Sequence, residues 1–360
     1  MRATLEEIND REAVTMDPEN APRIVTLGTA GGPRWWNQGE PTRRTGIATA
    51  VVVGESYYLV DCGHGVGRRL NEAGLPLRNL RGIFLTHLHS DHTIDLASLA
   101  VFGLYELVGR QGDPVRIIGP GDRGVLPPAS PRAVVPPRPI APESPTPGTR
   151  ESFELLMRAH ATDLNDRIID SLRPSPHELF TATDIQVPAG CGYHPNDNPT
   201  PDMEPFEVYR DELVTVTAIL VQHPPIAPAF GFRFETASGS VTFSGDTCYT
   251  PNMVRLARDT DLLLHEAIDF GFVERRYADP ADEGDRAARD HHYKSHTSVA
   301  DAARVAREAG ARQLALHHLV PGTARPEVWA EAGRHFDGPF FVPEDLDSLA
   351  LRPALDRVEA

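Results

Sequence analysis

The chain contains 360 residues, 40% of them hydrophobic, so it is long enough for one large globular domain or two ordinary ones and is not a fibrous or disordered polypeptide. Its formal net charge of −16, with Lys294 as the only lysine, disfavours a nucleic-acid partner unless a local basic patch is present. Three cysteines without a CxxC pair, a charged N-terminus and the absence of a run of roughly 20 apolar residues predict a cytoplasmic protein with no membrane partner.

The first part of the chain predicts a polar lead-in followed by a strand-rich core. Residues 1–22 form the lead-in, with a helix expected over 5–13, and one domain is expected over 23–360. Apolar runs between glycine-containing turns predict strands over 23–27, 49–53, 57–60 and 82–85. A helix over 66–73 is expected to end at Gly74.

The middle of the chain differs in composition from the rest. A helix is expected over 93–107, and residues 120–147 contain ten prolines, which predicts an extended loop. Between Thr149 and Leu172 apolar residues recur every three or four positions, which predicts one amphipathic helix. We expect residues at about 120–211 to form an inserted lid, and its helix is also a candidate contact in a homodimer.

The last part of the chain alternates strands with helices. Strands are expected over 213–222, 229–235, 240–244, 261–265 and 313–317, and helices over 252–259 and 298–309. Ser298 and Asp301 form a candidate capping box, and Gly310 follows the last helical residue. Early hairpins followed by alternating strands and helices predict an α/β fold of layered (α+β) type, with helices packed on sheets.

The densest group of chemical side chains directly follows the apolar run that ends at Leu85. It contains His87, His89, Asp91 and His92 within six residues. Residues two apart in an extended segment point to the same side, so the side chains of His87 and His89 are expected to face the same way. Asp91 and His92 follow where the chain turns toward a helix. Two imidazoles at one point, with a carboxylate and an imidazole at the next, are typical of two adjacent divalent metals of the zinc type. A polar strand end at the surface is the competing interpretation, which this spacing disfavours.

Three further side chains at predicted strand ends supply the ligands that this cluster lacks. His223 could complete one metal site with His87 and His89, and His318 could complete the other with Asp91 and His92. Asp246 has two carboxylate oxygens and could bridge both metals. Taken alone, each of the three is more typical of a solvated turn residue, but their joint occurrence favours their interpretation as metal ligands.

These residues carry a family resemblance that extends from about Arg23 to Gly322. The cluster, with Asp61 before it and the three later side chains after it, resembles the metallo-β-lactamase superfamily, and within it the ribonuclease Z and arylsulfatase-like branch. The matching stretches are Leu59-Val-Asp-Cys-Gly, Leu85-Thr-His-Leu-His-Ser-Asp-His, Phe230-Gly-Phe-Arg-Phe, Phe243-Ser-Gly-Asp-Thr, His265-Glu-Ala, Ser295-His-Thr-Ser and His318-Leu-Val-Pro.

The resemblance implies an αββα metallo-β-lactamase sandwich that holds two Zn²⁺ ions, with Mn²⁺ or Fe²⁺ as alternatives. It assigns one metal to His87, His89 and His223, the other to Asp91, His92 and His318, and Asp246 to both. A metal-bridging hydroxide is then the nucleophile.

The resemblance also gives roles to three side chains and leaves others without one. Asp91 would additionally orient the nucleophile, His296 would protonate the leaving group, and Glu266 would orient His296 and raise its pKa. Asp61 is expected to fix a ligand or a loop. Four histidines have no assigned role: His64, His291, His292 and His317.

The substrate is argued from charge and from motifs. Residues 111–222 contain nine Arg, no Lys and sixteen acidic residues, a net charge of 9 − 16 = −7, which predicts that this segment repels RNA. The stretch Pro41-Thr-Arg-Arg-Thr-Gly lacks the lysine of the ribonucleases, and Ile268 replaces their threonine. In contrast, Ala161-Thr-Asp-Leu-Asn-Asp-Arg-Ile resembles the arylsulfatase-like members.

The favoured function is therefore hydrolysis of a small, aromatic ester-type substrate, with a small molecule and no nucleic acid as partner. The lid is expected to form the pocket, and Trp35, Trp36 and Phe102 are candidate apolar walls. The alternative is a ribonuclease Z-type phosphodiesterase that processes tRNA 3′ ends. A redox di-iron protein is disfavoured because His89 occupies a position where such proteins typically have a carboxylate, and a scaffold without activity is disfavoured because all seven ligands are present.

Overall fold

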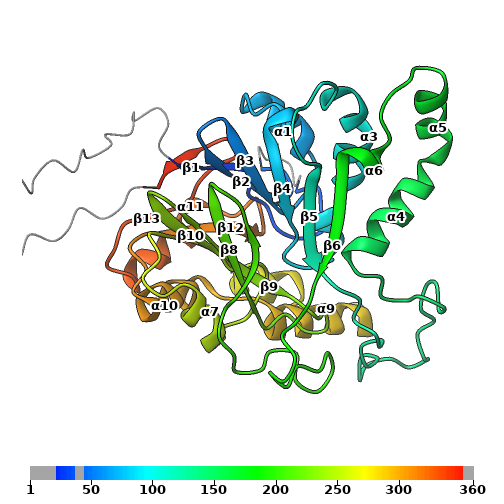
Figure 1. Cartoon of the computed structure of the whole chain (residues 1–360). Helices are drawn as coiled ribbons and strands as arrows, with labels where there is room; N and C mark the ends of the chain where they lie inside the picture. The colour runs from blue at the N-terminus through cyan, green and yellow to red at the C-terminus, as the bar shows by residue number, and fades with distance from the viewer. Residues whose placement is uncertain (1–21, 37–43, 352–360) are drawn as a thin grey trace, which may run out of the picture.

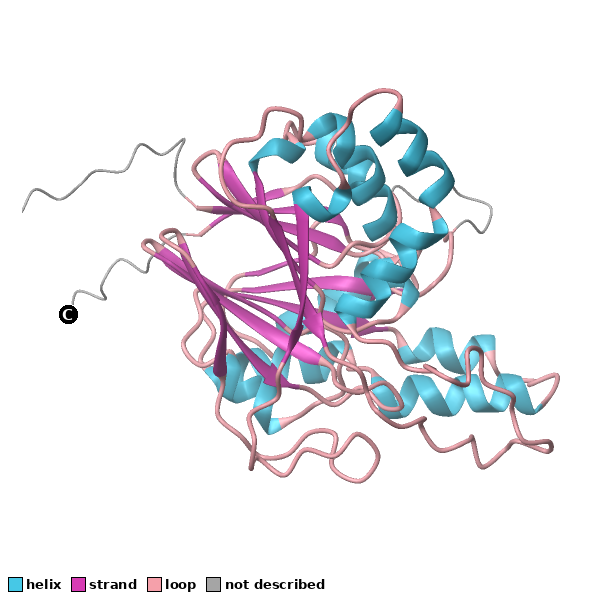
Figure 2. Cartoon of the chain, turned by 45° about the vertical axis from the view of Figure 1, so that its right-hand side comes forward, coloured by secondary structure: helices cyan, strands magenta, loops and turns pink. Residues whose placement is uncertain are grey.

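Two seven-stranded sheets lie face to face in the computed structural model, which describes residues 22–36 and 44–351 (Figures 1 and 2). Sheet A has the spatial order β14 (Ser348–Ala350), β1 (Arg23–Gly28), β2 (Ala48–Val53), β3 (Ser56–Val60), β4 (Leu80–Phe84), β5 (Val115–Pro120) and β6 (Phe180–Ile185). Sheet B has the order β13 (Phe340–Phe341), β12 (Leu314–Val320), β11 (Leu262–Ile268), β10 (Gly239–Phe243), β9 (Phe230–Thr236), β8 (Val214–Leu220) and β7 (Phe206–Arg210). Each sheet joins an antiparallel hairpin half to a parallel half, since β3 to β6 and β10 to β13 pair in parallel.

Helices cover the outer faces of both sheets, as Figure 2 shows. Sheet A is covered by α1 (Val66–Glu72), α3 (Leu96–Glu106) and α4 (Thr149–Ala159). Sheet B is covered by α7 (Pro251–Leu256) and α10 (Val299–Ala309). The predicted αββα layering is confirmed.

Aromatic side chains from both sheets fill the space between them. The Phe84 ring from β4 lies 5.0 Å from Phe234 and 5.8 Å from Phe232 of β9, both edge to face, and all three are fully buried. Such pairs add about 0.5–1.5 kcal/mol each to the free energy of burial. This core places the C-terminal ends of β4, β10, β11 and β12 at one edge of the sandwich.

Helix α10 forms for the reasons that its sequence suggests. The Ser298 hydroxyl accepts a hydrogen bond from the Asp301 backbone N–H at 3.0 Å, and Gly310 ends the helix with a left-handed φ of 67°. Residue positions at helical spacing bury small apolar side chains against sheet B: Ala302, Ala303, Val305, Ala306 and Ala309. The predicted N-cap at Ser298 and the predicted C-terminal boundary at Gly310 are confirmed.

The interval 120–211 contributes to the sandwich as well as to its periphery. The expected helix over 149–172 is two helices, α4 and α5 (Ala161–Ile169), which meet at His160. Its apolar residues Phe153, Met157 and Leu164 pack into the core between sheet A and its helices, so intramolecular packing accounts for the periodicity. In addition, β6 and β7 of this interval are the edge strands of the two sheets. The homodimer stays a prediction.

Several elements have no counterpart in the sequence analysis. They are β5, β6, β7, the short β13 and β14, α6 (Pro176–Leu179), α8 (Phe270–Arg276), α9 (Glu283–Ser295) and α11 (Pro326–Trp329). The expected N-terminal helix over 5–13 lies outside the described residues. Among the helices that the structure describes, none combines the length and the apolar character needed to cross a membrane.

Candidate metal centre

The His/Asp cluster lies at the sheet edge where β4 ends. The chain leaves the strand at Phe84 and enters the short helix α2 (Ser90–Thr93), which carries Asp91 and His92. His87, Asp91 and His92 are buried, and His89 is half-buried. The strand and the helix therefore hold the two halves of the cluster at neighbouring points.

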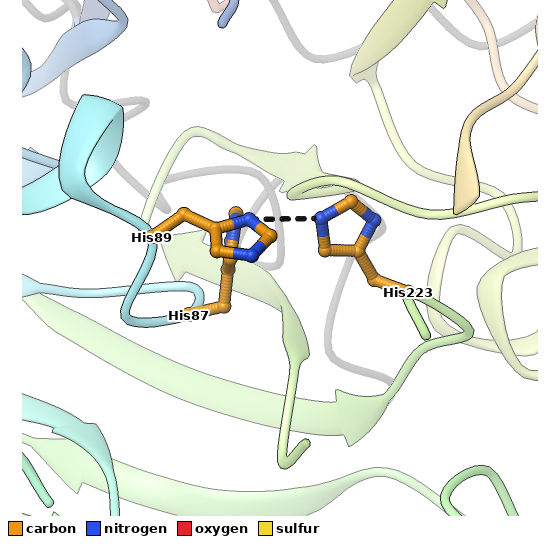
Figure 3. A group of neighbouring side chains, drawn as sticks. All are labelled: His87, His89 and His223. Atoms are coloured by element: carbon orange, nitrogen blue, oxygen red, sulfur yellow. Dashed lines mark hydrogen bonds between the residues drawn. The ribbon is translucent and has the colours of Figure 1, made fainter. Parts of the chain in front are cut away.

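Three imidazoles converge at the first point. The Nδ1 atom of His89 lies 3.0 Å from Nε2 of His87 and 3.2 Å from Nε2 of His223, which the chain supplies after β8 (Figure 3). The Nδ1 of His223 donates to the Ser295 carbonyl oxygen at 2.7 Å, which leaves Nε2 facing the other two rings. Burial lowers the pKa of all three imidazoles, so they are neutral, and neutral ring nitrogens are the form that binds metals.

Two imidazoles and two carboxylates converge at the second point. Nε2 of His318 lies 3.2 Å from Oδ1 of Asp246 and 3.4 Å from Oδ2 of Asp91, and Nε2 of His92 lies 3.4 Å from Oδ1 of Asp246. Burial opposes the ionisation of both carboxyls, but the neighbouring His92 and His318 outweigh it and hold their pKa values below the usual range. Both are therefore ionised.

Asp246 lies between the two points. Its Oδ1 faces His92 and His318, whereas its Oδ2 lies 3.7 Å from Nε2 of His223 and 3.9 Å from Nε2 of His87. One carboxylate thus presents one oxygen to each group of side chains.

Two irregularities of the backbone set the direction of the His318 side chain. His318 has a left-handed φ of 48°, and the pairing of β12 with β11 shifts register at this residue. A bulge of this kind redirects one side chain out of the strand alternation. The His318 ring consequently turns to the sheet edge, with Gly31 packed so closely against it that a Cβ there would clash with the ring.

Neighbouring groups hold the candidate ligands in orientation. Asp61 accepts hydrogen bonds from the Thr86 backbone N–H and from Nδ1 of His92, both at 2.8 Å. The Gly32 backbone N–H donates to Oδ2 of Asp91 at 2.9 Å. Carboxylates that fix a ligating histidine in this way set its tautomer and its direction.

The donor set fits a pair of divalent cations. The ligand atoms within each of the two groups lie within 4.8 Å of one another. Nε2 of His92 and Oδ1 of Asp246 are buried and have no hydrogen-bond partner among the described residues, which is costly for polar atoms unless something else binds them. Nitrogen ligands at one point and mixed nitrogen and oxygen ligands at the other are those of zinc-type metals.

The half-buried His296 pairs with the buried Glu266 beside this centre. Nδ1 of His296 donates to both carboxylate oxygens of Glu266, at 3.0 and 3.1 Å, and Oε1 of Glu266 also accepts from the Thr247 backbone N–H. Burial alone would lower the pKa of His296, but the charge and hydrogen bonds of Glu266 outweigh it and raise that pKa to about 9. His296 is therefore protonated near neutral pH, with Nε2 left unengaged by Glu266.

A cavity of about 310 Å³ opens from the candidate ligands His89, Asp91, Asp246 and His318. Its other walls come from the loop after β1 and from helices α8 and α9, and no residue of 120–211 lines it. Of the three expected apolar walls only Trp36 lies there. Trp35 is 86% exposed, and Phe102 is 65% exposed on α3, so both expectations are wrong.

The sequence analysis missed most of this wall. The lining side chains without an assigned role include Phe272, Tyr277, Ala288, His291 and His292. Helix α9 has almost no apolar periodicity. The sequence feature that could have predicted its start is the N-cap Asp282, whose side chain accepts a hydrogen bond from the Asp285 backbone N–H. Burial lowers the pKa of His291 to about 3 and that of His292 to about 4, so both rings are neutral.

Comparisons with known proteins agree with this geometry. Residues 42–318 match the family model described as Metallo-beta-lactamase superfamily. Ribonuclease Z of Mycobacterium sp. (strain KMS) is 30% identical over 92% of this chain and 97% of its own, and ribonuclease Z of Mycobacterium bovis is 29% identical over 86% and 93%. Human tRNase Z, short form, superposes with a TM-score of 0.58 at 19% identity, over 92% of this chain and 100% of its own. YhfI of Bacillus subtilis gives 0.55 at 17% identity, over 91% and 98%.

The expectation of a small-molecule partner and no nucleic acid is corrected by these comparisons, because the relatives aligned over most of the chain are named as ribonucleases. The charge argument failed for a physical reason. It summed charges over residues 111–222, although exposed charges more than about 10 Å apart are largely screened. Carboxylates in that sum are also neutralised by arginines outside the segment, as Glu212 is by Arg81 and Glu204 by Arg255.

Proposed function

The chain belongs to the metallo-beta-lactamase superfamily, in its ribonuclease Z branch, and from that premise we propose that this metal-dependent hydrolase is a phosphodiesterase that cleaves precursor tRNA at its 3′ side. The observation that carries the proposal is the alignment at 30% identity over 92% of this chain with a relative named ribonuclease Z. The proposal replaces the hydrolysis of an aromatic ester.

Seven side chains would hold two Zn²⁺ ions. His87, His89 and His223 are assigned to one ion, and Asp91, His92 and His318 to the other, with Asp246 shared. When bound, two such cations lower the pKa of water enough to make it a nucleophile and stabilise negative charge on a phosphoryl group.

The remaining steps belong to the protein. His296 lines the cavity and carries a proton at neutral pH, so Nε2 is placed to donate that proton to the leaving oxygen. Glu266 keeps Nδ1 engaged and stabilises the charged imidazole. Asp91 would orient the attacking water, while Gly32 fixes the carboxylate through its backbone N–H. Burial of Asp91, Asp246 and Glu266 strengthens each of these electrostatic interactions.

The test is cleavage of a precursor tRNA with a 3′ trailer by the zinc-loaded protein, with bis-p-nitrophenyl phosphate and p-nitrophenyl sulfate assayed beside it. We expect trailer release that depends on metal, and two metal ions per chain by elemental analysis. Turnover of either small ester without any cleavage of precursor tRNA would refute the proposed RNA substrate. Asp61→Asn is the variant to compare with the natural protein, because it weakens the hydrogen bond that orients His92 without removing a candidate ligand.

A further inference from the structure

The cavity beside the candidate metal centre has an aromatic wall that the proposed chemistry does not use. Trp36 comes from the loop after β1, Phe272 from α8, and Tyr277 directly follows α8. Val320 at the end of β12 and Ala288 of α9 complete this apolar side. The same cavity includes Asp91, Asp246 and His318, so an apolar surface and the phosphodiester-cleaving groups share one space.

The aromatic wall is fixed in place by the surrounding structure. The indole N–H of Trp36 donates to the Gly31 carbonyl oxygen at 2.7 Å, and its ring meets Phe272 edge to face at 6.0 Å. Gly322 packs against the indole, where a Cβ would press on the ring, and Trp36 and Tyr277 are each only 5% exposed. Phe272 is half-buried and is the most open ring of the wall, and because its neighbours already hold it in place, stacking on it would not carry the entropic cost of ordering the side chain.

Few polar groups surround the aromatic wall, and they are of the kinds that bind the phosphate and the base of a nucleotide. The Arg34 guanidinium lies 5.8 Å from the centre of the Trp36 ring, on an exposed side chain that lines the cavity. His292 lies against Tyr277, and its Nδ1 is buried without a hydrogen-bond partner among the described residues. A cationic group suits a phosphate, and a free imidazole nitrogen suits the polar edge of a base.

We propose that this aromatic wall is a subsite for one unpaired nucleobase of the RNA, next to the phosphodiester that is cleaved. The inference rests on the proposed function. A cavity of about 310 Å³ is at the low end of the range of ligand sites, roughly 300–1,000 Å³, so it admits a single ring system and not a base pair. Unpaired bases are recognised by stacking on aromatic side chains and on Arg planes, which are the groups present here.

The test compares two precursor RNAs that differ by one base. One carries a normal nucleotide on each side of the scissile phosphate, and the other has an abasic site at one of these two positions, each position being tried in turn. Loss of the base from the subsite is expected to weaken binding by ~5- to ~150-fold, which corresponds to ~1–3 kcal/mol for one stacked base. Binding of both RNAs is measured at equilibrium by fluorescence anisotropy, with uncleavable RNAs that carry a fluorophore at the 5′ end, away from the tested position.

Variants connect the effect to the wall. In Phe272→Leu the abasic RNA and the normal RNA should bind almost equally. Trp36→Leu removes the ring that packs edge to face against Phe272, so it should also reduce the difference between the two RNAs. Phe102→Leu is the matched control, because Phe102 is an exposed aromatic on α3 outside this cavity, and it should retain the full penalty. If Trp36→Leu fails to fold, Phe272→Leu still decides, because its half-buried ring is the less costly one to replace.

The outcomes separate this inference from the proposed function. Cleavage of precursor tRNA with equal binding of normal and abasic RNAs at both positions would overturn the subsite alone. An abasic penalty that persists unchanged in Phe272→Leu would also overturn it, because the base would then bind elsewhere. Failure to cleave any RNA would refute both.

Discussion

Replacing Glu266 with glutamine tests the proton chemistry of this site. Glu266→Gln retains the size of the side chain but removes the charge that opposes the effect of burial on His296. The pKa of His296 should then fall from about 9 toward its ordinary value of about 6.5, a difference of up to about 3 kcal/mol, while Asp246 and Asp91 continue to raise it. At pH 8 the protonated fraction of an imidazole falls from roughly 90% to roughly 3% for these two pKa values, so a step that needs this proton should slow by up to ~30-fold.

Two measurements check this prediction. Titration of the His296 ring by NMR in the metal-free protein gives its pKa directly, and the dependence of kcat on pH in the zinc-loaded enzyme gives the functional consequence. Glu308→Gln is the control, because Glu308 is an exposed carboxylate of α10 that pairs with Arg304, and its replacement should leave both unchanged. A His296 ring that still titrates near 9 in Glu266→Gln would refute the assignment of its raised pKa to this pair.

Three further predictions concern the ligands and the fold. Asp246→Ala should lower the metal content below two ions per chain and abolish turnover; normal metal content with full activity would refute the shared carboxylate. Gly31→Ala should displace the His318 ring and lower metal affinity while leaving the helix content seen by circular dichroism unchanged; an unaltered affinity in a chelator competition would contradict this packing argument. Asp211→Ala should lower the free energy of unfolding by ~3 kcal/mol, since it leaves the buried Tyr58 hydroxyl without its acceptor. Hydrogen bonds lower the pKa of Asp211, although burial opposes them, so its contribution is present above about pH 4 and is lost as the pH falls through the folded-state pKa; denaturant melts at pH 7 and pH 3 measure this.

The candidate ligands could be predicted because each lies where a local rule operates. His87 and His89 have the two-residue spacing of an extended chain, and the structure brings both to one point. Asp246 follows β10 and His318 lies near the end of β12, two strands that run in the same direction because each pairs in parallel with β11. His223 follows β8, which also runs in that direction because β8 and β10 both pair antiparallel with β9. The three side chains therefore share one edge. The same runs predicted helices packed on sheets, and the family resemblance implied the αββα order.

The cavity wall could not be predicted in this way. Helix α9 is stabilised by the Asp282 cap and by ion pairs such as Arg286 with Glu283, neither of which produces an apolar period. The edge strands β6 and β7 were missed for a related reason, since their side chains are mostly only partly buried and their sequences are correspondingly mixed. The partner was misjudged because a net charge carries no information about where the charges lie.

The distribution of the seven candidate ligands between the two halves of the chain has a consequence for biogenesis. Four side chains belong to the sheet A half and three to the sheet B half, and the ligand atoms meet only where the sheet edges converge. A ribosome-bound chain that has emerged only as far as β6 contains neither Asp246 nor His318, so it has no complete pair of sites to fill. Metal acquisition is therefore expected to be a late, post-translational event, and the stoichiometry of bound metal in a purified sample would count the molecules whose two halves have docked correctly.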